Sequence, residues 1–233
     1  MIDLAAVEVV TFDCYGTLID WESGILKESR KLLGADSSLV TDPTILDTYG
    51  RIESALESGS YRTYREVLTE CAQRIAKELG SNVTHDQCEA FADSIRTWQP
   101  FPDTVEALKS LKKTCRLGIL SNVDDELFAV TSDLLQVEFD FVVTAQQVGS
   151  YKPNYAHFIE AERRVGLNRD SWLHAAQSLH HDIAPCNALN IHNCWVHRPS
   201  RNGDFGAVLP AECTPQFQVP DLATLATMIS SGK

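Results

Sequence analysis

The feature that most constrains this chain is a mostly apolar run that ends in a carboxylate. Residues 9–12 precede Asp13, and a Gly-Thr turn at Gly16 and Thr17 follows almost at once. The run predicts a buried strand, and open α/β sheets bind their ligands at the carboxyl ends of their strands. A carboxylate at that place serves as a nucleophile or as a metal ligand. The residue two places further on helps to distinguish these roles, and it is Tyr15 rather than a second Asp.

The chain after residue 97 alternates between helical and strand patterns. Such alternation favours a parallel sheet with helices on both faces. Including the first run, we expect strands at residues 7–12, 116–120, 139–144, 172–176, 190–196 and 217–219. We expect helices in this part at residues 104–113, 125–135, 155–165, 183–189 and 221–229.

Residues 16–97 have helical periodicity and no good strand pattern. Four helices are expected there, at residues 24–33, 43–58, 63–79 and 85–98. The simplest arrangement is an α/β fold with a Rossmann-like, doubly wound parallel sheet core and an inserted helical cap subdomain. The predicted core therefore comprises residues 1–15 and 98–233, and the predicted cap comprises residues 16–97.

Charge and composition exclude several classes of partner. The net charge is −12, which makes nucleic acid a poor partner. The chain has no apolar stretch of about 18 residues, and its N-terminus lacks a basic region followed by a long apolar one. We therefore expect no membrane span, no signal peptide and a cytoplasmic protein. The seven cysteines are scattered without a CxxC pair, which supports neither a disulfide framework nor a zinc ribbon.

Four polar positions follow predicted strands: Asp13, Ser121-Asn122, Lys152 and Asp182. Each has an ordinary structural interpretation as a turn-capping Asp, a pair of turn formers, a solvated Lys and a helix N-cap, respectively. Because the carboxyl ends of parallel strands meet at one edge of a sheet, we expect these side chains to share a pocket. That pocket combines a nucleophilic carboxylate, small donors, a cation and a second carboxylate.

The same positions resemble the four motifs of the haloacid dehalogenase superfamily. In motif order, the matching positions are residues 12–18, Ser121-Asn122, Lys152-Pro153 and residues 176–182. The helical insert lies where this superfamily has its cap, and the resemblance covers essentially the whole chain. The chain is therefore identified as a member, which implies a Rossmann-like core and covalent catalysis by a carboxylate.

Within the superfamily, the chain resembles the L-2-haloacid dehalogenases more than the phosphatases. Phosphatases carry an Asp two residues after the nucleophile and acidic residues in motif four, whereas this chain has Tyr15 and Gln177. Tyrosine is a poor proton donor at neutral pH because its pKa is about 10, and Mg²⁺ prefers carboxylate and phosphate oxygens. The dehalogenase pattern Asp-x-Tyr-Gly-Thr-Leu matches residues 13–18. The resemblance thus implies that no metal or other cofactor is needed.

The resemblance implies roles for four catalytic residues. Asp13 attacks the carbon that bears the halogen, and water then hydrolyses the ester at the Asp13 carboxyl carbon. Lys152 keeps Asp13 ionised, while Asp182 pairs with Lys152 and helps to position the water. Thr17 holds an oxygen of Asp13 or of the substrate carboxylate.

Further residues are implied in binding the substrate or the halide. Tyr15 forms a wall of the pocket, Ser121 shares the role of Thr17, and Asn122 helps to bind the leaving halide. The branch also uses a cap arginine for the halide, and Arg51 is the choice in this chain. The other candidates are Phe158, Gln177 and Ser178, with Arg62 and Arg65 as alternatives to Arg51.

The sequence therefore predicts hydrolytic dehalogenation of small 2-haloacids, such as L-2-haloalkanoates or haloacetate. Gln177-Ser178 departs from the Ser-x-Asn of the dehalogenases, which leaves other reactions open. The alternatives are ring opening of azetidine-2-carboxylate by the same covalent mechanism, an Mg²⁺-dependent phosphatase and a non-catalytic binding protein. The expected partner is a small anionic substrate, and a homodimer is possible.

Overall fold

The computed structural model describes residues 2–166, 168–200, 203, 207–208 and 210–232. Within these residues, one six-stranded sheet has the order β3-β2-β1-β4-β5-β6, and its neighbouring strands are all parallel. The strands are β1 (Val9–Phe12), β2 (Arg116–Ser121), β3 (Phe141–Thr144), β4 (Trp172–Ala176), β5 (His192–Val196) and β6 (Phe217–Val219).

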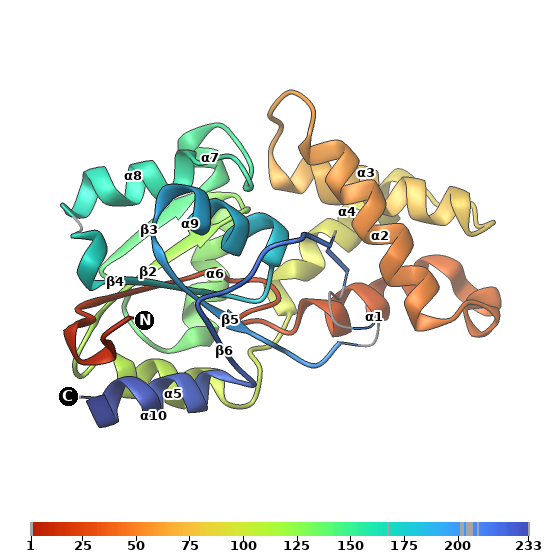
Figure 1. The fold of residues 1–233 in the computed structure, drawn as a ribbon. Coiled ribbons are helices and arrows are strands. Elements are labelled where there is room, and N and C mark those ends of the chain that lie inside the picture. Colours follow the sequence, from red (N-terminus) through yellow and green to blue (C-terminus); the bar gives the residue numbers. More distant parts are fainter. Residues whose placement is uncertain (1, 167, 201–202, 204–206, 209, 233) are drawn as a thin grey trace.

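Helices cover both faces of the sheet (Figure 1). One face carries α5 (Thr104–Leu111), α6 (Asp125–Leu135) and α10 (Leu222–Gly232), and the other carries α7 (Ala145–Val148), α8 (Ala156–Val165) and α9 (Ala184–Leu189). Val10 and Phe12 join the apolar cluster of the first face, whereas Val9 packs with Phe158 and Cys186 on the second. Successive strand side chains point to opposite faces, so a strand covered on both sides has to be apolar almost throughout.

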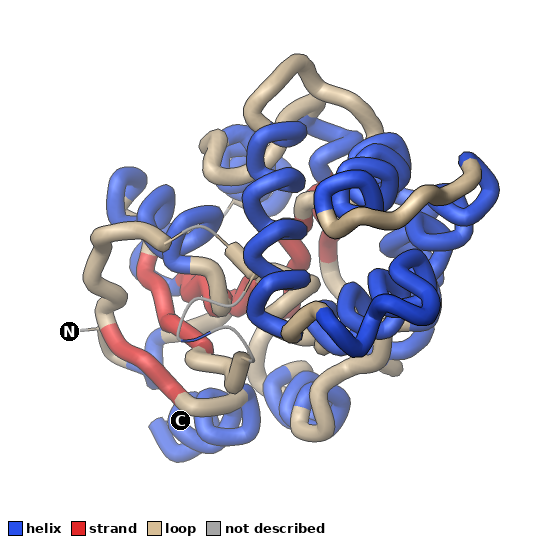
Figure 2. Tube along the Cα trace, turned by 90° about the vertical axis from the view of Figure 1, so that its right-hand side faces the viewer, coloured by secondary structure: helices blue, strands red, loops and turns tan. Residues whose placement is uncertain are grey.

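Four more helices lie between β1 and α5 in the chain. They are α1 (Trp21–Leu33), α2 (Asp42–Glu57), α3 (Tyr64–Glu78) and α4 (His85–Asp93). These helices lie together to the right of the sheet in Figure 1. Figure 2 views the molecule from that direction, so the helices lie in front of the strands. Capping boxes at Thr63 and Thr84 begin α3 and α4. We call this group of helices the cap.

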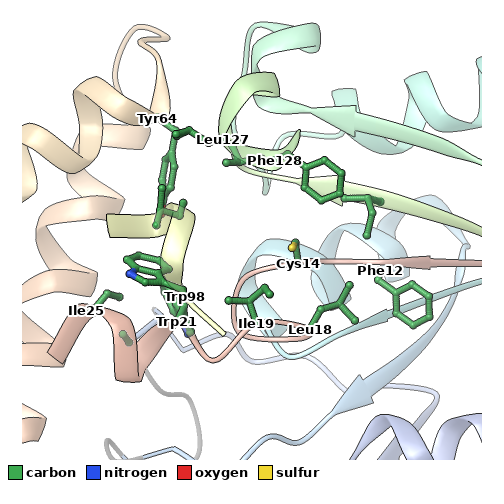
Figure 3. Close-up of a cluster of buried hydrophobic side chains, with 14 of the residues drawn as sticks. Phe12, Cys14, Leu18, Ile19, Trp21, Ile25, Tyr64, Trp98, Leu127 and Phe128 are labelled. Carbon is green, nitrogen blue, oxygen red and sulfur yellow. The ribbon is translucent and has the colours of Figure 1, made fainter. Parts of the chain in front are cut away.

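A continuous cluster of buried apolar side chains joins the sheet to the cap (Figure 3). Phe12 at the end of β1 belongs to this cluster, and Cys14 and Ile19 add to it from the turn that follows. Trp21 and Ile25 continue it on α1. All five residues are at most 6% exposed. Because closely packed side chains resist displacement, this cluster holds α1 in a defined position relative to the end of β1.

The fold confirms the sequence-based prediction, with differences at the ends of elements. All six strands are present, and β4 and β6 have the predicted bounds. The helix expected at residues 85–98 ends at Asp93 and continues as a 3₁₀ turn, because Ser94 Oγ donates to the Phe91 carbonyl. The sequence pattern does not predict α7 or a π-helical turn at Leu179–Ile183. None of the described helices is long and apolar enough to cross a bilayer.

Candidate active site

The Lys152 ammonium is the centre of a buried polar site at the carboxyl ends of the strands. Its Nζ donates to Asp13 Oδ1 at 2.9 Å, to Asp182 Oδ1 at 2.7 Å and to the Leu120 carbonyl at 2.8 Å. These three bonds use every hydrogen of the ammonium group. Burial lowers the pKa of Lys152, but the two carboxylates outweigh burial and raise it above its ordinary value. One buried cation therefore serves two buried carboxylates.

Both carboxylate oxygens of Asp13 are held. Oδ2 accepts the Thr17 hydroxyl at 2.8 Å, and the same hydroxyl oxygen accepts the Gln177 backbone N–H at 2.9 Å. The turn that brings Thr17 back to Asp13 passes through Gly16, whose φ of 98° is strained for any residue with a side chain. Burial raises the pKa of Asp13, and Lys152 and Thr17 oppose this rise.

Asp182 is held by a chain of hydrogen bonds that starts in the core. Trp172 Nε1 donates to Thr11 Oγ1 at 2.7 Å, and Thr11 Oγ1 lies 2.8 Å from His174 Nδ1. The Thr11 hydroxyl still has its own hydrogen to donate, and His174 Nδ1 is the acceptor beside it. In that tautomer, His174 Nε2–H donates to Asp182 Oδ1 at 3.0 Å. Although burial acts in the opposite direction, Lys152 and His174 hold the pKa of Asp182 well below its usual range.

Asn122 positions the backbone of Lys152. Its Oδ1 accepts the Lys152 N–H at 2.7 Å, and its Nδ2 donates to the Lys152 carbonyl at 3.1 Å and to Glu57 Oε2 at 3.3 Å. Both amide hydrogens are thus directed at acceptors of the protein. These hydrogen bonds connect Asn122 of the second motif to Lys152 of the third motif and to Glu57 of the cap.

A small cavity of about 40 Å³ lies over Asp13. The core contributes Asp13, Tyr15, Ser121, Asn122, Lys152, Gln177, Ser178, His181, Asp182 and Val208 to its lining, and the cap contributes Trp21, Glu53, Glu57 and Tyr64. A hollow of about 780 Å³ adjoins it, and Glu57, Lys152 and His181 line both spaces. The hollow therefore lies next to the cavity that contains the nucleophile.

Two buried oxygens at this cavity have no hydrogen-bond partner within the described part of the chain. They are Ser121 Oγ and Asp182 Oδ2. Unsatisfied buried polar atoms are costly and usually mark a place where a ligand or water binds. The hydroxyl provides a donor for a substrate oxygen, and the carboxylate oxygen provides an acceptor for a water molecule.

The pattern of the haloacid dehalogenase-like hydrolases matches residues 7–175, which include Asp13, Ser121 and Lys152. This chain belongs to that family. Haloacetate dehalogenase H-2 of Moraxella sp. (strain B) is 23% identical over 231 residues, covering 96% of this chain and 98% of the relative. An (S)-2-haloacid dehalogenase of Pseudomonas putida is 23% identical over 229 residues, with 96% of each chain covered.

A solved structure supports the fold of this hydrolase. L-2-haloacid dehalogenase from Xanthobacter autotrophicus, with chloropropionic acid covalently bound, superposes with a TM-score of 0.81 at 18% identity. The superposition covers 96% of this chain and 98% of that one. The similarity extends over the cap as well as the sheet.

Most of the predicted site residues of the hydrolase lie together. Thr17 contacts Asp13 from behind the cavity, and Tyr15 forms part of the wall, with its hydroxyl 2.8 Å from Thr131 Oγ1. Ser178 Oγ accepts the His181 N–H at 2.9 Å and so begins the π-helical turn that carries Asp182. The predicted residues that line the cavity are Asp13, Tyr15, Ser121, Asn122, Lys152, Gln177, Ser178 and Asp182.

The structure does not place Arg51 in the site. Its side chain is 59% exposed and pairs with Glu78 of α3. The reason is helical phase: Arg51 precedes Glu53 by about 200° of rotation, so when Glu53 faces the cavity, Arg51 faces away. Arg62 and Arg65 also pair with cap carboxylates and do not line the cavity.

Phe158 also lies outside the cavity lining. It is 1% exposed and belongs to the apolar cluster between the sheet and α8. Its ring is nearly perpendicular to the His174 ring, and the two ring centroids lie 5.3 Å apart. Phe158 follows the start of α8 by two residues, which turns its side chain toward the sheet. Its contribution to the site is therefore indirect, through the residue that holds Asp182.

Sequence reasoning missed the cap carboxylates. Glu53 and Glu57 line the cavity, as does Tyr64 of α3. A signal exists, because Glu53 falls on the same helical stripe as the buried Ile45 and Tyr49. An acid on an apolar stripe is a feature that deserves a functional interpretation. Among the described residues, no group of three or more His, Cys, Asp or Glu is arranged to hold a metal ion.

Proposed function

We propose that this hydrolase releases halide from small 2-haloacids by displacement at Asp13, without a metal ion. The observation that carries the proposal is the Asp13 carboxylate at the floor of a small cavity, with one oxygen held by Lys152 and the other by Thr17. A carboxylate held at both oxygens is oriented for attack on a carbon above it. The relatives named haloacetate and (S)-2-haloacid dehalogenase support the same substrate class.

The reaction has two steps. In the first, an Asp13 oxygen forms a bond to the carbon bearing the halogen, and the carbon–halogen bond breaks with its electron pair on the departing halide. In the second, water adds to the carboxyl carbon of the Asp13 ester, and the bond from that carbon to the ester oxygen breaks. The 2-hydroxyacid leaves, and Asp13 is regenerated with one oxygen from water.

Lys152 and Asp182 support both steps. The Lys152 ammonium stabilises the Asp13 carboxylate before attack and the negative oxygen that develops when water adds to the ester. Asp182 keeps the ammonium in place, and its Oδ2, which has no partner in the described structure, offers an acceptor for the attacking water. The Ser121 hydroxyl lines the same cavity and offers a donor to the substrate carboxylate.

The absence of a metal requirement is proposed from the chemistry of the side chains. The Lys152 ammonium lies between two carboxylates, where it supplies the positive charge that a bound cation supplies elsewhere. Tyr15 and Gln177 offer no anionic oxygen. Burial also raises the pKa of Tyr15 well above its ordinary value, which disfavours Tyr15 as the acid of a phosphatase reaction.

Halide release from L- and D-2-chloropropionate, chloroacetate and fluoroacetate, with EDTA and with added Mg²⁺, tests the proposal. We expect EDTA-insensitive release that Asp13→Asn abolishes and that Asp170→Asn, a change on the exposed surface, leaves intact. A single turnover in H₂¹⁸O should place ¹⁸O in Asp13 rather than in the product. Phosphate-ester hydrolysis stimulated by Mg²⁺, without halide release, would contradict the proposal.

A further inference from the structure

Two cap carboxylates face the nucleophile across the small cavity. Glu53 and Glu57 are four residues apart on α2, so they share one face of the helix, and both line the cavity with Asp13. They are almost fully enclosed, since Glu53 is 5% exposed and the side chain of Glu57 is 6% exposed. The displacement reaction proposed above uses neither of them.

The charges around Glu57 favour its protonated form. Lys152 already donates all its ammonium hydrogens to other acceptors. His181 Nε2 lies 3.9 Å from Glu57 Oε2, but burial lowers the pKa of His181 to about 3, so the imidazole is neutral. None of the described residues that line the cavity is an arginine. Glu57 thus shares the cavity with Glu53 and Asp13 without a cation of its own, and buried carboxylates so close together do not all ionise.

The hydrogen bonds distinguish the two carboxyl groups. Glu53 Oε1 accepts the hydroxyls of Tyr49 and Tyr64, both at 2.6 Å, which favours a charged Glu53. Burial nevertheless raises the pKa of Glu53 to about 7, and burial together with Glu53 raises the pKa of Glu57 well above its ordinary value. Glu57 Oε2 accepts from Asn122 Nδ2 at 3.3 Å. This oxygen therefore acts as the carbonyl oxygen, and the acid hydrogen belongs on Oε1.

We propose that the Glu57 acid group donates a hydrogen bond to the departing atom, and that the cavity therefore favours fluoride among the halides as leaving group. The proposal rests on the displacement reaction described above. As the bond from Asp13 to carbon forms and the carbon–fluorine bond breaks, the electron pair passes to fluorine. The Glu57 hydrogen stays on Glu57 and stabilises the fluoride until it leaves. Fluoride is a small, strong hydrogen-bond acceptor, so it gains more from this donor than bromide does.

A second observation supports a ligand at this place. The Ser121 hydroxyl is fully buried, lines the same cavity and has no partner within the described residues. The Ser121 hydroxyl lies on the core side of the cavity and can donate to the carboxylate of a haloacetate. The halogen of a substrate bound in this way lies towards the cap. The cavity of about 40 Å³ is small, which also suits the smallest halogen.

The test compares fluoride and bromide release from fluoroacetate and bromoacetate, two achiral substrates that differ only in the leaving atom. Glu57→Leu removes the donor, and we expect the ratio of kcat/KM for fluoroacetate to that for bromoacetate to fall on the order of 100-fold. Glu57→Gln keeps an N–H donor that does not titrate, so its ratio should lie between those of Glu57→Leu and the wild type. Glu78→Leu, an exposed cap position paired with Arg51, is the matched control and should leave the ratio unchanged.

The pH dependence of the same ratio provides an independent readout. Glu53, Asp13, Lys152 and His181 face Glu57, and because the two substrates share these groups, their general effects cancel in the ratio. In the wild type, the ratio should fall as pH rises through the raised pKa of Glu57, whereas Glu57→Gln should show no such fall. An unchanged ratio in both Glu57 variants, with bromide still released, would overturn this inference and leave the proposed function standing. Absence of any halide release from the wild type would overturn both.

Discussion

Lys152 and Asp182 form a buried ion pair. Their charged atoms lie 2.7 Å apart, and the side chains are 1% and 0% exposed. Asp182 is itself held by His174, whose ring is oriented by Thr11 of β1. The position of the ammonium relative to Asp13 is thus determined by hydrogen bonds that reach into the sheet rather than by the flexible lysine side chain.

Lys152→Met removes the cation that two buried carboxylates share. We expect a loss of about 3–5 kcal/mol in the free energy of unfolding, the usual cost of breaking a buried ion pair, together with loss of halide release. Urea unfolding followed by circular dichroism measures the first quantity. Lys109→Met, at a partly exposed position on α5, is the control and should change stability by less than about 0.5 kcal/mol. A Lys152→Met variant as stable as the wild type would contradict this account of the site.

Thr17→Val removes the donor to Asp13 Oδ2 and the acceptor for the Gln177 N–H while keeping the shape of the side chain. Because the lost bond is to a charged oxygen, we expect kcat to fall roughly 10- to 100-fold. Thr17→Ser keeps the hydroxyl and should retain most of the activity. Steady-state halide release by the two variants checks this expectation, and equal activity of both would show that the hydroxyl is not needed.

The core half of the site could be predicted because it depends on local patterns and on one topological rule. Ser121 ends a strand, and Asp13 and Asp182 each follow one. Parallel strands in this order bring those ends together. The partner of Asp182 could not be found in this way. His174 lies within β4, and its side chain contacts Asp182 from there. The orientation of its ring depends on Thr11, which is its partner in the register between β1 and β4. The sequence alone does not reveal that register.

The cap half of the site was predicted less well, because it depends on the rotation of helices. The helix pattern at residues 43–58 is correct within one residue at each end. Which of Arg51, Glu53 and Glu57 faces Asp13 depends on how α2 packs against the core. Arg51 is the side chain that the family resemblance favours, and the structure turns it toward Glu78. Tertiary packing therefore places two acids where a cation was expected.

Glu53 makes stability depend on pH in a defined direction. Burial raises its pKa from the ordinary 4.5 to about 7. The folded state thus binds the proton more tightly than the unfolded state does. The stabilisation is fully present below about pH 4.5 and is lost as pH rises through about 7, by up to about 3 kcal/mol.

Glu53→Gln removes this titration and keeps an oxygen for the two tyrosine hydroxyls. The stability of the variant relative to the wild type should therefore rise between about pH 4.5 and pH 8, by up to about 3 kcal/mol. The difference in stability between variant and wild type at each pH is the proper measure. The pKa values of His157 and His181 are lowered to about 3, so these groups make stability rise with pH, and both proteins contain them. Parallel unfolding curves over this range would show that folding does not raise the pKa of Glu53.

Asp124 connects the core to the cap through the backbone of α3. It lies two residues after Asn122, and its two carboxylate oxygens accept the N–H groups of Tyr64 and Arg65, both at 2.9 Å. These N–H groups begin a helix and have no acceptor within it, so a negative side chain from the core satisfies both and interacts favourably with the helix dipole. The contact holds Tyr64 at the wall of the cavity.

Asp124→Ala should therefore loosen the cap without touching the nucleophile. We expect a loss of about 1–2 kcal/mol in stability, as for other helix caps, and faster hydrogen exchange at the Tyr64 and Arg65 amides. In the proposed reaction the cap encloses the substrate while the core performs the chemistry, so KM should rise more than kcat falls. Asp133→Ala, an exposed change on α6, is the control for both measurements. A variant in which kcat falls and KM stays constant would place Asp124 in the chemical step rather than in closure of the cap.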